Sequence, residues 1–165
     1  MSTFTVSIAY THTVTYVTTK MLLLLKEIIR EIGLDPSKFS DEWETNERAI
    51  STWLASRDLQ RATLEIYNPR DGALAARWDM DVVYATVGDG CLWADTAAAR
   101  YAIAKAGLVP SSCRYDILLK TAPGRPDVYG WGPCDFRSTE GFKRYAVGAT
   151  VGGNGLSAQT AYWSR

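Results

Sequence analysis

Residues 61–84 read RATLEIYNPRDGALAARWDMDVVY and predict a β-hairpin. Apolar and polar side chains alternate along the first half, and this period of two places successive side chains on opposite faces of a strand. The segment from Asn68 to Gly72 has the residue types of a tight turn. The return strand is expected to point Trp78 inward and to carry charged side chains on its other face, namely Arg77, Asp79 and Asp81.

The segment before this hairpin also alternates. Between Thr3 and Val17, apolar and hydroxyl residues follow one another almost without a break, which predicts a long strand with one buried face. The even-numbered side chains, His12 among them, are then expected to be buried and the strand to be ordered against the sheet. It is expected to run directly into a leucine-rich helix over Lys20–Ile32, with Gly33 at the helix C-cap.

The remaining elements complete an α+β pattern. Ser40 is the expected N-cap of a second helix and Asp95 that of a third, which ends near Gly107. Further segments follow in order: a strand over Cys113–Thr121, a Pro/Gly-rich loop over Ala122–Cys134, and a final hairpin formed by Arg144–Val151 and Leu156–Trp163. We therefore expect one domain in which helices pack on one face of a mainly antiparallel sheet.

Composition narrows the functional classes. The 165 residues include 18 basic and 18 acidic side chains, so the chain has no net positive charge that would attract nucleic acid or an anionic membrane. The N-terminus has no basic segment typical of a signal peptide, and Met21–Leu25 is too short to span a bilayer. The three widely spaced cysteines favour buried thiols in a reducing compartment. A cytoplasmic location is expected.

Few residues are candidates for catalysis. His12 is the only histidine, which excludes a two-histidine metal site, and a packed core histidine is favoured over a general base. Asp79 and Asp81 could form a carboxylate pair, but Arg77 shares their face and Arg61 lies across the hairpin, so a solvated salt-bridge ladder is favoured over an acid/base or metal pair. No cofactor is indicated.

Three loop features have both a structural and a functional interpretation. Gly88-Asp89-Gly90 matches a dinucleotide fingerprint weakly, since Trp93 stands where its third glycine belongs. Gly124-Arg125-Pro126-Asp127 is more typical of a rigid turn than of a ligand-binding loop. Trp131 lies between two glycines in a loop, and an exposed aromatic there would be a binding candidate.

Several segments, in order, resemble a known family. Leu64–Asn68, a short turn and Leu74–Asp81 resemble the central hairpin of HORMA-domain proteins, including the Arg77-Trp78 pair of the spindle-checkpoint members. Cys113–Leu119 resembles the next strand of that family. The segment from Phe136 to Trp163 is similar to its mobile C-terminal safety belt. Three further segments resemble the bacterial branch: Thr11–Thr18, Gly33–Ser37 and Pro123–Asp127.

The resemblance implies a HORMA fold, with three main helices on the sheet, and a signalling protein rather than an enzyme. Such domains add a short closure-motif peptide to a sheet edge and wrap the safety belt over it. A Pch2/Trip13-type AAA+ ATPase releases the peptide by engaging the N-terminal region. Bacterial members resemble the regulators of anti-phage CBASS systems, in which the peptide-bound form activates a cGAS/DncV-like nucleotidyltransferase.

Carried over by position, the resemblance assigns a core over about 1–127 and a safety belt over about 128–165. The peptide-binding edge would comprise Cys113, Arg114, Tyr115, Asp116, Ile117, Leu118, Leu119 and Lys120. The belt would use Trp131, Phe136, Phe142, Tyr145, Val147, Tyr162 and Trp163, and the hairpin motif Arg77, Trp78 and Asp79 would be structural.

Partners follow from the same resemblance. The chain begins two residues before the expected first strand and stops two residues after Trp163, so the peptide is expected in trans, with a second HORMA protein as one source. Two alternatives stay open at this point. One is a generic α+β adaptor without a mobile belt, and the other is a small hydrolase that uses His12 or the Asp79/Asp81 pair.

Overall fold

The computed structural model describes residues 3–85 and 91–165, with side chains from residue 10 onward. In it, the hairpin predicted over residues 61–84 lies within a larger antiparallel sheet. Its strands are β1 (Leu59–Tyr67) and β2 (Leu74–Tyr84), which pair antiparallel. The turn closes as its residue types predict, because the Asn68 N–H donates to the Ala73 carbonyl at 2.9 Å.

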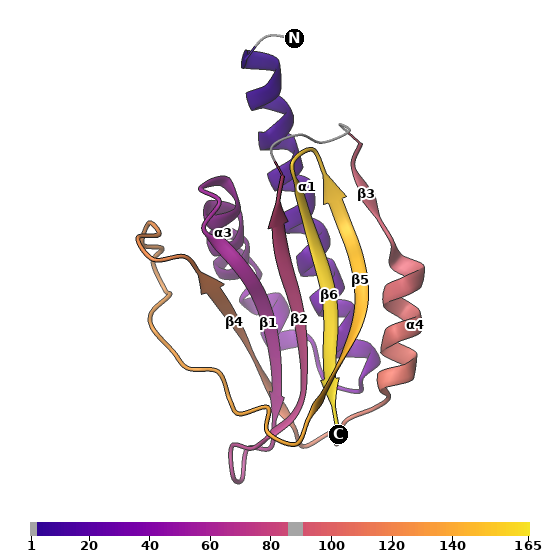
Figure 1. The fold of residues 1–165 in the computed structure, drawn as a ribbon. Helices are drawn as coiled ribbons and strands as arrows, with labels where there is room; N and C mark the ends of the chain where they lie inside the picture. Colours follow the sequence, from indigo (N-terminus) through magenta and orange to yellow (C-terminus); the bar gives the residue numbers. More distant parts are fainter. Residues whose placement is uncertain (1–2, 86–90) are drawn as a thin grey trace.

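The described strands form one six-stranded sheet in the order β3-β5-β6-β2-β1-β4, and every neighbouring pair is antiparallel. The other strands are β3 (Trp93–Ala94), β4 (Arg114–Thr121), β5 (Lys143–Gly153) and β6 (Leu156–Ser164). The helices are α1 (Thr3–Glu31), α2 (Ser37–Asp41), α3 (Trp43–Ala55) and α4 (Thr96–Ala106). Figure 1 shows α1 and α3 together behind the sheet and α4 beside β5, which confirms the α+β arrangement.

The predicted N-terminal strand is wrong, because residues 3–17 belong to α1. The buried side chains that follow Thr13 recur at helical spacing: Val14, Val17, Thr18, Met21, Leu22 and Leu25. The hydroxyl residues fit the helix as well, since the Thr15 hydroxyl donates to the Thr11 carbonyl one turn earlier, at 3.2 Å. The alternation is real in the sequence, but burial against α3 and the sheet follows the helical period.

His12 is exposed in the helix, so the predicted core position is also wrong. The side chains of Phe4, Val6 and Ile8, which the strand prediction placed in the core, lie outside the described residues. The second part of the prediction is confirmed, because the leucine-rich segment is helical and Gly33 follows it with a left-handed φ of +97°.

The strand and the helix interpretations of the N-terminal segment predict different effects of mutations on stability. Val17 is fully buried, so Val17→Ala lowers the free energy of unfolding by about 1.5 kcal/mol, the value of two buried methyl groups. His12→Ala changes that free energy by less than about 0.5 kcal/mol because the imidazole is exposed. Urea denaturation of both variants measures the difference. A larger loss for His12→Ala than for Val17→Ala would contradict the helix.

Helix starts are predicted with mixed success. The Asp95 side chain caps α4 by accepting the Ala98 N–H at 3.0 Å, as predicted. Ser40 is not an N-cap, because it lies inside α2. The following helix, α3, has Glu42 at its N-cap without a side-chain cap bond. Just before α2, the Asp35 carboxylate accepts the N–H and the hydroxyl of Ser37 at 2.9 and 2.6 Å. Those two bonds to Ser37 hold the pKa of the Asp35 carboxyl below its usual range.

Other predictions have clear outcomes. Cys91 and Cys134 are exposed and Cys113 is half-buried, so the predicted burial of the thiols is wrong for two of them. Gly88-Asp89-Gly90 lies outside the described residues. Across residues 3–85 and 91–165, none of the helices combines the length and apolarity that a bilayer span requires. The same residues contain no cluster of histidine, cysteine and acidic side chains suited to a metal ion.

Candidate functional site: a free strand edge beneath a strap

β4 has a free edge within the described part of the chain, because it is the last strand of the sheet and pairs with β1 alone. The Ala122 N–H, just after β4, donates to the Asp58 carbonyl beside β1 at 2.8 Å. The Lys38 ammonium, from α2, donates to the Tyr115 carbonyl at 3.0 Å. Main-chain groups alternate in direction along an antiparallel strand. Tyr115, Ile117 and Leu119 therefore turn their N–H and C=O groups toward the free edge.

The structure places seven of the eight predicted edge residues in β4, and Cys113 directly before it. Tyr115 fixes this strand to the start of α2. Its hydroxyl donates to the Asp35 carbonyl at 2.8 Å and accepts the Phe39 N–H at 3.1 Å. Burial raises the pKa of Tyr115, so the hydroxyl keeps the proton that this pair of bonds requires. The edge strand is thus held rigidly on its helical side.

After β4 the chain forms a long connection without helix or strand, residues 122–142, which we call the strap. Figure 1 shows that the strap leaves the upper end of β4, passes outside that strand and enters β5 from below. The hairpin β5–β6 pairs with β2, so it lies on the other side of β1–β2 from the free edge. This placement leaves the edge of β4 uncovered by any described strand.

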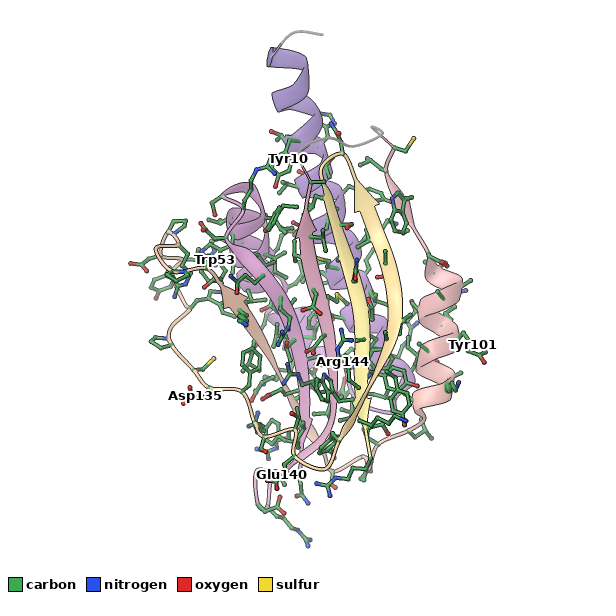
Figure 2. All side chains as sticks on the ribbon, in the orientation of Figure 1. Tyr10, Trp53, Tyr101, Asp135, Glu140 and Arg144 are labelled. Atoms are coloured by element: carbon green, nitrogen blue, oxygen red, sulfur yellow. The ribbon has the colours of Figure 1, made fainter. Side chains whose placement is uncertain are left out.

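The upper part of the strap is anchored on α3 through two tryptophans. The indole of Trp53, labelled in Figure 2, donates to the Pro126 carbonyl at 2.7 Å. The Trp131 indole donates to the Thr45 carbonyl at 3.2 Å and packs edge-on against Trp53, with ring centroids 6.1 Å apart. Trp131 is half-buried in this anchor, so it does not meet the condition of exposure under which it would be a binding candidate.

The lower part of the strap is anchored by Arg137. Its backbone N–H and its guanidinium donate to the two carboxylate oxygens of Glu65 at 2.7 and 2.8 Å. The guanidinium also lies 3.3 Å from Asp116 of β4 and 3.7 Å from the Tyr67 ring centre. The Glu65 side chain is fully buried. The strap therefore both covers and neutralises a carboxylate of the central hairpin.

Between these two anchors, the strap crosses four consecutive exposed residues, Gly132, Pro133, Cys134 and Asp135. Asp135, labelled in Figure 2, projects outward from this span. A segment that is fixed at both ends and exposed in the middle can move away from the neighbouring strand without losing its attachments. The arrangement is suited to a strap that shifts relative to β4 between its two anchors.

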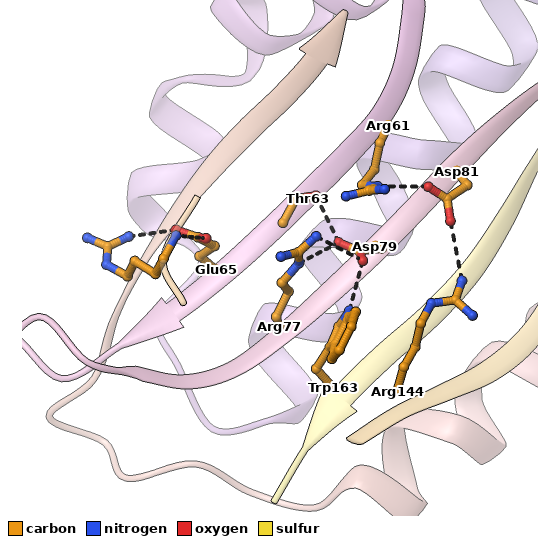
Figure 3. A network of polar contacts seen from close by, with 9 residues as sticks. Arg61, Thr63, Glu65, Arg77, Asp79, Asp81, Arg144 and Trp163 are labelled. Carbon is orange, nitrogen blue, oxygen red and sulfur yellow. Dashed lines mark hydrogen bonds and ion pairs between the residues drawn. The ribbon is translucent and has the colours of Figure 1, made fainter. Parts of the chain in front are cut away.

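A second polar cluster lies on the outer face of the sheet and joins β6 to the hairpin (Figure 3). Asp79 accepts bonds from the Thr63 hydroxyl at 2.8 Å, from the Arg77 guanidinium at 2.9 Å and from the Trp163 indole at 2.9 Å. Asp79 and Arg77 are buried, since Phe136 and Trp163 pack over the guanidinium. The predicted solvated ladder is therefore wrong for this pair.

The outer part of the predicted ladder is confirmed. Asp81 accepts from Arg61 at 2.8 Å and from Arg144 of β5 at 3.3 Å, and all three side chains are partly exposed. Because both Asp79 and Asp81 are occupied by cationic partners, they do not form the carboxylate pair that a hydrolase would need. His12 lies on α1 and is exposed. The geometry thus gives no support to the hydrolase alternative.

The other residues predicted for the belt pack into the C-terminal hairpin or against its ends. Tyr145 stacks on Tyr162 at 5.1 Å, and Tyr162 packs on Trp78 at 4.9 Å. Val147 is half-buried against the core, and the Phe142 ring lies 4.7 Å from the Arg165 guanidinium.

Four residues with defined roles in this site were not predicted from the sequence. They are Lys38, Trp53, Glu65 and Arg137. Glu65 alternates with apolar neighbours and looks like a solvent-facing strand residue, and only the strap above it makes it buried. Trp53 lies in the core, but its bond to the strap carbonyl depends on the path of a loop 73 residues later, at Pro126. The alternation of side chains along a strand predicts neither the contact of Glu65 with the strap nor that of Trp53.

Comparisons with known proteins agree with this geometry. A family model described as bacterial HORMA domain 2 matches residues 1–165. A chain in the crystal structure of the mitotic checkpoint complex has a TM-score of 0.71 at 10% identity, covering 90% of this chain and 98% of that one. C. elegans HTP-2 bound to the HIM-3 closure motif has a TM-score of 0.67 at 12% identity, covering 92% and 86%. HTP-2 bound to HTP-3 motif-6 has a TM-score of 0.66 at 13% identity, covering 92% and 87%. No curated protein matches the chain.

Proposed function

The chain belongs to the bacterial HORMA domain family, and we propose that it captures a short peptide, supplied in trans, as an added strand on the free edge of β4. The observation that carries this proposal is the combination of an unpaired strand edge with a strap anchored on both sides of it. Exposed strand edges are normally blunted or covered because they invite pairing with another chain. An edge that stays available beneath a covering segment is suited to controlled pairing.

The two related structures support the proposal by analogy. HTP-2 shares the fold of this chain and was solved with closure motifs bound. In our proposal, residues 128–165 act as the belt around a core of residues 1–127. The peptide pairs with the outward main-chain groups of Ile117 and Leu119 and with the Tyr115 N–H, because the Tyr115 carbonyl already accepts from Lys38. The strap then closes over the peptide. The predicted binding residues from Cys113 to Lys120 then provide the edge.

The cellular role of the complex follows from the resemblance alone. We propose a cytoplasmic, non-enzymatic regulator of anti-phage defence, whose peptide-bound form binds and activates a cGAS/DncV-like nucleotidyltransferase. A Pch2/Trip13-type AAA+ ATPase would reset it, and a second HORMA protein is one source of the peptide. Co-purification with such a nucleotidyltransferase, dependent on added peptide, tests this part. Activation that is equal with and without peptide would contradict it.

A proline in the edge strand tests the peptide site directly. Ile117→Pro removes an outward N–H and places a ring against the incoming strand, but it spares the pairing with β1. We expect peptide affinity to fall by about tenfold, which corresponds to about 1.4 kcal/mol, one lost hydrogen bond with some steric conflict. Isothermal titration with a peptide selected from a display library measures the change.

The matched control for that experiment is Ile117→Val, which keeps the N–H and a branched apolar side chain. It should bind the selected peptide within about twofold of the unmodified chain. Thermal melting of both variants checks that the fold is retained. Equal affinity for Ile117→Pro and Ile117→Val would show that the peptide does not pair with β4.

A further inference from the structure

One lysine lies across the free edge. Lys38 belongs to α2 on the helical side of the sheet, while Asp116 lies on the outer side, where it shares Arg137 with Glu65. The Lys38 ammonium nevertheless contacts both the edge carbonyl of Tyr115 at 3.0 Å and the Asp116 carboxylate at 3.3 Å. Its side chain therefore bends around β4 and places a positive charge where an added strand would begin or end.

This ammonium retains binding capacity. A lysine has three N–H donors, and the described contacts use two of them, on Tyr115 and Asp116. The Lys38 side chain is 51% exposed, so its third donor can reach a ligand from solvent. No rearrangement of the fold is needed for that contact.

The carboxylates around Lys38 already have hydrogen-bond or ion-pair partners. A surface depression of about 470 Å3 is lined by Asp35, Lys38, Arg114 and Tyr115, among others. Its one carboxylate, Asp35, is already bonded to the N–H and hydroxyl of Ser37. The Asp116 carboxylate lies 3.3 Å from both the Lys38 ammonium and the Arg137 guanidinium. Lys38 and Arg114 are thus the exposed cationic side chains that a ligand would meet at this end of the edge.

From this arrangement we infer that Lys38 determines specificity, by selecting peptides with an aspartate or glutamate beside Tyr115. The inference rests on the proposed function, since it assigns a chemistry to the peptide that the β4 edge binds. An acidic side chain at that point meets the third donor of Lys38 and the Arg114 guanidinium. A basic side chain there meets two like charges, which repel it.

The experiment uses the full chain and a display library of random 12-residue peptides. We expect the enriched peptides to share an acidic residue at one position of their common motif. Lys38→Met should lower the affinity of one such peptide about fivefold, a factor typical of one partly exposed ion pair, and should leave its glutamate-to-glutamine analogue unchanged. Lys38→Glu should shift the selected residue from acidic to lysine or arginine.

Lys105→Met is the matched control, because this exposed lysine lies on α4, which packs beside β5 at the other side of the sheet from β4. It should leave the acidic preference intact. Enriched peptides with no acidic position, or a preference lost in Lys105→Met and kept in Lys38→Met, would overturn the inference while leaving edge binding in place. A library that yields no peptide sensitive to Ile117→Pro would instead overturn the proposed function.

Discussion

Replacing Asp79 by alanine lowers the free energy of unfolding by about 3–5 kcal/mol, the range for a buried ion pair that loses one partner. The Arg77 side chain is only 7% exposed and is covered by the rings of Phe136 and Trp163. Without Asp79, its guanidinium keeps a full charge in that enclosed position. The Thr63 hydroxyl and the Trp163 indole lose their acceptor at the same time.

Asp81 provides a control on the same face of the same strand. It also pairs with arginine, but its side chain is 34% exposed, so Asp81→Ala should cost less than about 1 kcal/mol. Urea denaturation of the two variants, analysed with a common slope, measures the contrast. Equal losses for Asp79→Ala and Asp81→Ala would show that the Arg77–Asp79 pair is not buried as described.

Replacing Arg137 by methionine releases the lower anchor of the strap. The fully buried carboxylate of Glu65 then keeps only the backbone N–H of residue 137, and the unfolding free energy falls by about 3 kcal/mol. Because a hydrated carboxylate is far more stable than a buried unpaired one, the strap should lift from the sheet. In a peptide complex, the same change should accelerate dissociation by at least about tenfold, since the lower end of the strap is no longer held beside β4.

Hydrogen exchange separates these effects from general destabilisation. We expect faster exchange over residues 132–142 in Arg137→Met, with unchanged protection in β1 and β2 at low denaturant. Arg144→Met is the control, because Arg144 pairs with the partly exposed Asp81 and lies outside the strap. A double-mutant cycle with Glu65→Gln should show coupling of at least about 1 kcal/mol between Glu65 and Arg137. If the two substitutions had additive effects on the unfolding free energy, Arg137 and Glu65 would not interact as described.

Much of the fold follows from local patterns. The alternation in residues 61–67 and 74–84, the Asn68 turn and the Asp95 cap each depend on residues within one element, and the structure confirms all of them. The N-terminal prediction failed because two periods were present in one segment. Thr11, Thr13 and Thr15 suggest a period of two, but the apolar residues that continue from Val14 to Leu25 bury along a helix.

The candidate site, like the fold, could be predicted from the sequence only in part. The sequence marks β4 as a strand through its alternation, and it marks residues 122–142 as irregular through proline and glycine. It does not show that β4 is an edge, because strand order depends on where the C-terminal hairpin pairs. It also does not show that Lys38 bends around that edge, since its partners Tyr115 and Asp116 are more than 70 residues away.

The sequence by itself therefore determined the central hairpin, the α+β class and the family resemblance, because each depends on short-range periodicity or on the order of local segments. Only the tertiary structure decided that the N-terminal segment is a helix and that Glu65 and Asp79 are buried. It also decided that the strap is pinned at Trp53 and Glu65. These features arise when distant segments exclude water from one another, and a strand face looks the same in sequence whether solvent or another part of the chain covers it.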